Sequence, residues 1–209
     1  MLKRLLARFG RDPGGVSAIE FALCAPPFIL MLLAGVDLTR YSIAARAVER
    51  ATASIAQMVA VNTVGSASID EIHFYQSAAF AAFPGVLGDS KRAGVAWDAD
   101  MAIAVSSVNL TQPSGGAATA SLGWSVGPSR RTCGQLFTAA DTAAPSRTTI
   151  AASAFGTGSI LVVDSRFTFV PMIAARLLPT LVIARTFYAR PRYVPTVALT
   201  GTSADATQC

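Results

Sequence analysis

One carboxylate, Glu20, stands out among the residues that could do chemistry because it lies inside a long apolar run. The run extends from Gly14 to Val36, and Glu20 is its only charged residue. An ionisable side chain at the centre of a membrane helix costs roughly 2.5–3.5 kcal/mol, and less near an end, so such residues tend to mark function. Glu20 is therefore the first candidate functional residue.

No catalytic constellation accompanies this carboxylate. The sequence contains one histidine, His73, no convincing Ser/His/Asp set, no phosphate-binding loop and no zinc-ligand spacing. Because no Cys/His cluster is near it, His73 is expected to be a packing or surface residue. We therefore expect a protein that is not an enzyme and that uses neither a cofactor nor a metal.

The three cysteines divide between two environments. Cys24 lies in the apolar run, where it is most simply a small apolar side chain. Cys133 and Cys209 lie well beyond it, in the part expected to be exported. Exported domains meet oxidising conditions, so a disulfide between these two is reasonable, but two free thiols fit the sequence equally well.

The apolar run has the length of a membrane helix only if Glu20 is included. Phe21 to Val36 spans about 24 Å as a helix, short of a hydrocarbon core of about 30 Å, whereas the 23 residues from Gly14 reach about 34 Å. A secretory signal peptide cleaved near Ala47, a lipoprotein signal at Cys24 and a buried helix of a soluble protein are the alternatives.

Composition agrees with a chain that is part membrane helix and part exported domain. Of the 209 residues, 52% are hydrophobic and only 14% are charged. The net charge of +5 is concentrated in residues 1–15, which carry +3, so the remainder is too weakly basic for a nucleic-acid surface. The basic flank favours a cytoplasmic N-terminus. It consists of Lys3, Arg4, Arg8 and Arg11, set against Asp12.

The apolar run and its flanks resemble the N-terminus of TadE-like proteins, which are minor pseudopilins and assembly proteins of tight-adherence (Flp, type IVc) pili. A glycine followed five residues later by a glutamate, at the head of an apolar helix, is the mark that a prepilin peptidase recognises in the pilin superfamily. The residues that carry the resemblance are Gly15–Leu23, Pro26, Gly35, Asp37 and Arg40.

The resemblance implies a processing site and a role for the carboxylate. The Gly15–Val16 peptide bond would be the one cleaved, and Glu20 would be the pilin-type glutamate. The C-terminal region, from Ser159 to Arg192, also resembles the corresponding part of TadE-like proteins. It holds an apolar strand, a crossover rich in Pro and Leu, and a strand that closes on Arg-Pro-Arg.

Two helices are predicted after the membrane segment. The first continues the membrane helix, because apolar residues recur at three- and four-residue steps from Leu38 to Val59. This stripe is expected to pack on the protein's own domain, with neighbouring filament helices as the alternative. The second begins at the capping box Ser68–Glu71 and ends near Pro84. Its expected core residues are Ile69, Ile72, Ala79, Phe80 and Phe83.

The remainder of the chain has the pattern of β-structure. Residues 127–149 are expected to form a long loop that holds Cys133. A connector, 171–179, is expected between the last two strands. The predicted strands are a possible one at 93–97, a hairpin of 101–110 with 117–126, a strong strand at 159–170 and a last strand at 180–190.

These patterns together predict an α+β protein with a long N-terminal transmembrane helix. The exterior domain is expected to hold a second helix and an antiparallel sheet of about four strands. The expected divisions are a cytoplasmic basic leader (1–15), the transmembrane helix (16–36), a helix extension outside the membrane (37–62) and the exterior α+β domain (63–209).

The resemblance implies a structural role in the biogenesis of tight-adherence pili. The implied partners are the bacterial inner membrane, the prepilin peptidase, other pilins or pseudopilins and the pilus assembly platform, with no nucleic acid and no small-molecule substrate. The C-terminal domain would be periplasmic or exterior. Two alternatives remain, an uncleaved bitopic assembly or secretion accessory and an exported enzyme or binding protein with a signal peptide.

Overall fold

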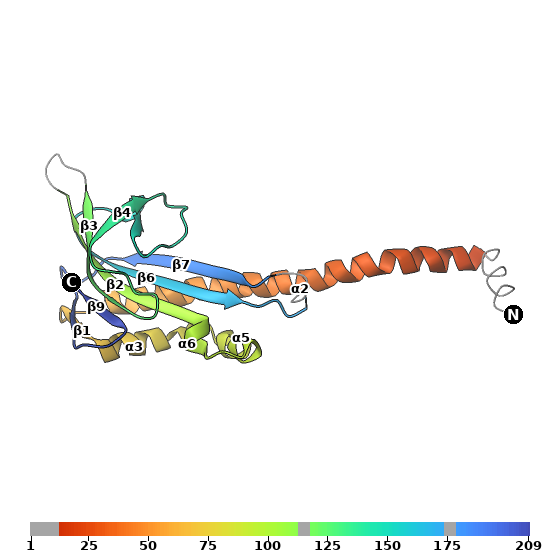
Figure 1. Ribbon diagram of the computed structural model, residues 1–209, viewed down its shortest axis with the longest axis horizontal. Helices are drawn as coiled ribbons and strands as arrows, with labels where there is room; N and C mark the ends of the chain where they lie inside the picture. Colours follow the sequence, from red (N-terminus) through yellow and green to blue (C-terminus); the bar gives the residue numbers. More distant parts are fainter. Residues whose placement is uncertain (1–12, 113–117, 174–178) are drawn as a thin grey trace. The chain divides into compact units, whose positions relative to one another are not determined.

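The structure is a computed structural model that describes residues 13–112, 118–173 and 179–209 (Figure 1). The chain divides into two compact units. The first consists of residues 1–42 and 171–179, and the second of residues 43–170 and 180–209. The greater part of the expected basic leader, residues 1–12, lies outside the described residues.

The N-terminal helix, α2 (Pro13–Ala60), is 48 residues long and contributes to both units. It remains helical through Pro26 and Pro27, although each proline removes a backbone donor. In the first unit almost every side chain from Ser17 to Val36 is exposed. The helix is therefore continuous across the apolar run and the amphipathic stretch that follows it, as the spacing of apolar residues predicted.

In the second unit the apolar stripe of α2 packs on a sheet. Val48, Ile55 and Val59 are fully buried, and Thr52 shares a hydrogen bond with Ser165 of the sheet. The expectation that this stripe packs on the protein's own domain is confirmed from Val48 onward. At 1.5–3 kcal/mol for each large apolar side chain buried, this contact is a main source of the stability of the second unit.

The sheet differs from the expected four antiparallel strands. Within the described residues it has seven strands in the order β5-β4-β3-β2-β6-β7, with β9 also paired to β3, and it is mixed because β4 and β5 are parallel. Its strands are β2 (Met101–Thr111), β3 (Thr119–Val126), β4 (Gln135–Ala139), β5 (Thr149–Ala151), β6 (Gly158–Phe169), β7 (Leu181–Ala189) and β9 (Ala206–Gln208).

The long strands agree with the sequence-based prediction and the short ones do not. The β2–β3 hairpin, β6 and β7 lie where they were predicted, although the hairpin's tip at 113–117 lies outside the described residues. The predicted loop 127–149 is wrong in part, because β4 and the first residue of β5 lie in it. These strands have five and three residues, too few for a period-two apolar pattern to be detected. A further parallel pair joins β1 (Ser66–Ser68) to β8 (Ala198–Thr200).

Short helices cover one edge of the second unit (Figure 1). Ser68 caps α3 as predicted, since its Oγ accepts a hydrogen bond of 3.2 Å from the N–H of Glu71. Of the expected core residues, four are buried and Phe80 is half-buried against Trp97, with ring centroids 4.1 Å apart. These helices are α3 (Ile69–Ser77), α4 (Ala79–Ala82), α5 (Gly85–Ala93) and α6 (Trp97–Asp100). A 3₁₀ turn, η1 (Ala152–Ala154), follows β5.

The possible strand at 93–97 is wrong. Ala93 ends α5, Gly94 caps that helix with a φ of 72°, and Trp97 begins α6. The left-handed conformation at Gly94 is one that glycine adopts without a steric penalty, and it ends the helix. Trp97 packs against Phe80 of α4, whereas Val95 is 46% exposed, so the apolar residues of this stretch do not form one face of a strand.

Candidate functional site

The predicted processing residues lie at the beginning of α2. Gly15 and Val16 are in its first turns, and Glu20 follows one turn later with an exposed side chain. Val16 and Glu20 are four residues apart, a spacing that places them on the same face of a helix. The structure thus brings the three predicted residues together at one helix end. No described residue pairs with the Glu20 carboxylate.

The peptide between Gly15 and Val16 is helical in the structure. A protease acts on an unwound peptide, so cleavage here would require the first turns of α2 to open. Glycine destabilises a helix by roughly 0.5–1 kcal/mol relative to alanine, and a helix end frays more readily than its middle. Gly14 and Gly15 therefore lower the cost of opening at the position where the pilin-type pattern places the cleaved bond.

Large apolar side chains surround α2 on all sides between Ile19 and Leu32. Within the described residues, α2 alone is long and apolar enough to cross a membrane. Transfer of its exposed apolar side chains out of water is worth on the order of 10 kcal/mol. This exceeds the roughly 2.5–3.5 kcal/mol cost of inserting Glu20, so insertion is favourable overall. The side chains are Ile19, Phe21, Leu23, Phe28, Ile29, Leu30, Met31 and Leu32, each 57–78% exposed.

A second carboxylate, Asp37, ends the apolar run and is buried, with 3% exposure. Its two oxygens accept separate hydrogen bonds, 2.9 Å from the backbone N–H of Met172 and 3.0 Å from that of Ile173. The Arg40 guanidinium lies 3.5 Å from one of these oxygens. Hydrogen bonds to a charged group contribute about 1.5–3 kcal/mol each, so this contact firmly joins the helix to the segment after β6.

A buried ion pair lies in the second unit, where a cavity of about 480 Å³ is lined by Arg131 and residues of β7. Arg131 is 1% exposed and donates to one oxygen of Asp164 through Nε at 3.0 Å and Nη2 at 2.8 Å. Its Nη1 donates to the carbonyl of Thr149, and the Thr186 hydroxyl donates to the other Asp164 oxygen. The polar atoms are therefore satisfied by one another, and the group links β6 and β7 to β5.

Tyr188 of β7 makes a further contact with β5 beside the same cavity. Its hydroxyl accepts a hydrogen bond of 3.1 Å from the backbone N–H of Ala151 in β5. Burial raises the pKa of Tyr188 above its usual value, so the hydroxyl stays neutral. Together with the Arg131–Asp164 pair, Tyr188 thus braces the strands that surround this cavity.

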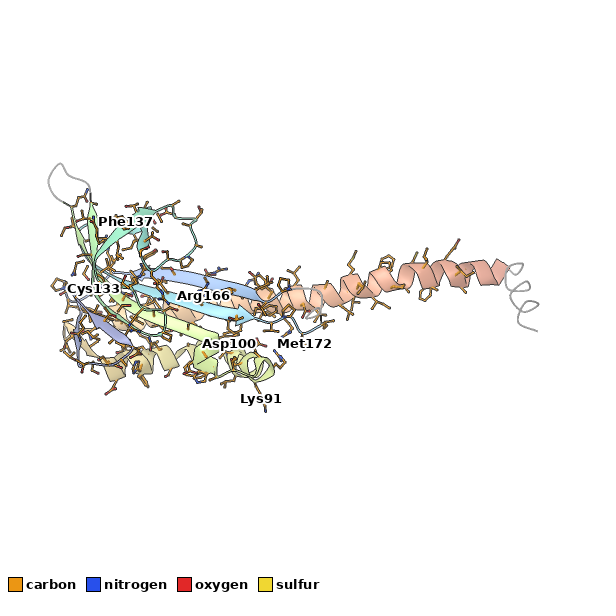
Figure 2. The ribbon with its side chains drawn as sticks, in the orientation of Figure 1. Lys91, Asp100, Cys133, Phe137, Arg166 and Met172 are labelled. Atoms are coloured by element: carbon orange, nitrogen blue, oxygen red, sulfur yellow. A yellow bond between two sulfur atoms is a disulfide. The ribbon has the colours of Figure 1, made fainter. Side chains whose placement is uncertain are left out.

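The two distal cysteines are joined in the structure. The sulfur atoms of Cys133, which is labelled in Figure 2, and Cys209 form a bond of 2.07 Å. Cys24 is a free, exposed thiol. The backbone N–H of Cys209 also donates to the carbonyl of Gly123 in β3, at 2.9 Å. The C-terminal strand β9 is thus held to the sheet by a covalent bond as well as by its pairing with β3.

His73 lies at the surface and pairs with Asp205, with 3.0 Å between Nε2 and Oδ2. Partial burial alone would raise the pKa of Asp205, but hydrogen bonds from Ser203 and His73 outweigh it and hold that pKa below its usual value. The described residues hold no group of three or more potential metal ligands. Through its contact with Asp205, His73 links α3 to the segment before β9.

Residues 15–57 match the family model of TadE-like proteins. The comparisons with curated proteins and with solved structures give no match. A single N-terminal apolar helix followed by an α+β domain fits the class of single-pass, membrane-anchored proteins. The matched segment is TadE-like, which confirms the resemblance to TadE-like proteins of tight-adherence pili, and it contains Gly15, Val16, Glu20 and Asp37.

Sequence reasoning found the residues of the helix but missed their contacts with distant segments. The sequence marks Asp37 and Arg40 only as part of the resemblance. The two backbone N–H groups from which Asp37 accepts hydrogen bonds are 135 and 136 residues away in the chain. Arg131 lies in a segment rich in Gly, Pro and Ser, where an arginine is expected to be solvated. A carboxylate placed directly after an apolar run was the one available signal for Asp37.

Proposed function

We propose that this protein is a membrane-anchored, pilin-like component in the biogenesis of tight-adherence pili and that its role is structural and not enzymatic. The observation that carries the proposal is the exposed apolar helix that bears Glu20 inside the TadE-like segment. An apolar surface of this size requires lipid or other apolar helices around it. Pilins provide such helices to one another when they assemble.

The proposed orientation places residues 1–15 in the cytoplasm, 16–36 in the bacterial inner membrane, and 37–62 and 63–209 in the periplasm or exterior. The net charge of +3 on residues 1–15 supports this orientation. The Cys133–Cys209 bond supports it too, because disulfides persist in oxidising compartments. The proposed partners are other pilins or pseudopilins and the pilus assembly platform.

We further propose that a prepilin peptidase cleaves the Gly15–Val16 bond. Cleavage would remove the basic leader and leave a new α-ammonium group on Val16. That group would lie one helical turn from Glu20, close enough to neutralise its carboxylate within the chain or in a neighbouring subunit. Processing would then lower the cost of holding Glu20 in an apolar environment.

The N-terminal sequence and mass of the protein purified from its membrane test this proposal. A mature protein that begins at Val16 is expected. The Gly15→Ala variant is expected to retain the leader and to increase in mass by that of residues 1–15, relative to the processed protein. Gly14→Ala is the matched control, because it changes a neighbouring helical glycine and leaves the pilin-type spacing intact.

The uncleaved accessory is the second candidate, favoured by the helical geometry of the Gly15–Val16 peptide. It predicts that the mature protein begins at Met1 and that Gly15→Ala matches wild type in both mass and pilus assembly. A mature N-terminus near Val48 would instead support a signal peptide and an exported enzyme or binding protein. The same measurement therefore separates all three functions.

A further inference from the structure

The segment between β6 and β7 begins with apolar side chains that are exposed. Met172, labelled in Figure 2, is 53% exposed, and Ile173 is 37% exposed. Residues 171–179 contain one charged residue, Arg176, and no acidic residue. A connector of a water-soluble domain usually carries polar residues at its exposed positions. The exposed apolar side chains therefore indicate that this segment contacts something other than water.

Asp37 fixes the position of this segment along α2. Its two oxygens accept hydrogen bonds from the backbone N–H groups of Met172 and Ile173, so both residues lie at the level of residue 37 of the helix. The side chain of Asp37 is buried by this contact. Because each oxygen has its own donor, the contact sets the orientation of the segment as well as its distance from the helix.

Residue 37 is also where the apolar run ends. The 16 residues from Phe21 to Val36 carry no charge, and Asp37 and Arg40 are the first charged residues after them. In a helix that crosses the bilayer, the first charged residues after the run lie in the headgroup region, since a charge deeper in the hydrocarbon is costly. Met172 and Ile173 must then lie in the same region.

We propose that Asp37 holds residues 171–173, at the start of the β6–β7 segment, against the outer surface of the bilayer, with Met172 and Ile173 inserted among the phospholipid headgroups. Val36 and Leu38, on either side of Asp37, are themselves 39% and 66% exposed and continue the apolar surface of the helix. The protein thus contacts lipid at two places, the helix and this segment. This second contact restricts rotation and tilt of the helix, and it rests on the proposed membrane anchoring.

Fluorescent probes at single cysteines in lipid nanodiscs test the proposal. All variants carry Cys24→Ser and keep the Cys133–Cys209 bond, so that a thiol-reactive dye labels one position. Leu30→Cys reports on the helix, Met172→Cys on the segment, and Phe137→Cys is the control, because Phe137 is also apolar and 62% exposed but lies on β4 (Figure 2). Lipids with a quencher at a shallow or a deep position measure the depth of each probe.

The Met172 probe is expected to lose most of its emission to the shallow quencher and little to the deep one, because interfacial segments insert about 5–10 Å. The Leu30 probe should respond to the deep quencher, and the Phe137 probe to neither. A Met172 probe that behaves like the Phe137 probe while Leu30 is quenched overturns the proposal and leaves the anchor intact. If the Leu30 probe is not quenched, the anchor and the proposal both fail.

The role of Asp37 is tested in the same system by Asp37→Ala, which removes both acceptors. The Met172 probe is expected to lose most of its shallow quenching while the Leu30 probe stays unchanged. The matched control is Thr39→Ala, because the Thr39 hydroxyl donates to the carbonyl of Gly35 within the same helix. Unchanged quenching in Asp37→Ala contradicts the holding role. Shielding from aqueous iodide without lipid quenching would indicate protein contact and overturns the lipid assignment.

Discussion

At the scale of single residues, two carboxylates on α2 lie in opposite environments. Asp37 is buried and accepts two backbone hydrogen bonds. Glu20 is exposed, and no described residue pairs with it, although it lies among side chains that favour an apolar environment. A carboxylate without a partner has a high free-energy cost in lipid unless a cation pairs with it. Glu20 is therefore suited to a partner that arrives during processing or assembly.

We expect Glu20→Ala to give a protein that inserts into the membrane and fails to support pili. The substitution removes a cost of insertion and also removes the charge that would pair with the new amine of Val16. Membrane fractionation measures the first effect and counts of surface pili measure the second. Ser17→Ala, at another exposed position of the same helix end, should behave as wild type. Normal pilus numbers in Glu20→Ala would remove the charge-pairing mechanism and leave processing unaffected.

The second residue-scale prediction concerns the buried ion pair of Arg131 and Asp164. We expect Asp164→Ala to destabilise the domain by roughly 3–5 kcal/mol, because it leaves the guanidinium of Arg131 buried without its counter-charge. Urea unfolding of the detergent-solubilised protein measures the change. The exposed Asp98, at the start of α6, provides the control: Asp98→Ala should cost less than about 1 kcal/mol. Equal effects of the two substitutions would contradict a bracing role for Arg131.

At the scale of elements, the sequence predicted those whose pattern extends over several repeats. The helix α2 has apolar residues at helical spacing over many turns, and β2, β3, β6 and β7 each have 8 to 12 residues. A pattern of that length outweighs single exceptions such as Pro26. The pilin-type residues Gly15 and Glu20 could be found for the same reason, since their spacing is local.

The elements that the sequence did not predict depend on contacts between distant parts of the chain. β4, β5 and β9 have three to five residues each, and they are strands because neighbouring strands offer backbone partners. β3 pairs with β4 and β9, and β4 in turn pairs with β5. The N–H groups that Asp37 binds belong to a segment more than 130 residues away. Local propensity contains no information about such partners, so the edge of the sheet and the Asp37 contact could not be predicted.

The cysteines provide a prediction at this scale, because their bond fixes the short strand β9. Thiol labelling of denatured, unreduced protein should detect one reactive thiol, that of Cys24, and three after reduction. Reduction should lower the free energy of unfolding by roughly 4 kcal/mol, from the chain entropy released when a loop with a sequence separation of 76 opens. The Cys24→Ser variant should show no thiol before reduction. Three thiols in unreduced protein would contradict the bond.

At the scale of the whole molecule, charge and cysteine chemistry differ between the two ends of the chain. The N-terminal 15 residues carry a net charge of +3, while the remaining 194 residues carry only +2. The disulfide lies entirely in the C-terminal part. Basic flanks are retained in the cytoplasm and disulfides form outside it, so the two features favour the same orientation of one membrane span.

This orientation leads to a prediction for the intact chain. A reporter that is active only outside the cytoplasm should be active when fused after Cys209 and inactive when fused before Met1, because a single span places the two ends on opposite sides. A reporter that is active only in the cytoplasm should give the reverse pattern and serves as the control for expression. If the first reporter is active at Met1 and inactive at Cys209, the disulfide would face a reducing compartment, and both the proposed orientation and the lipid contact at the outer surface would be wrong.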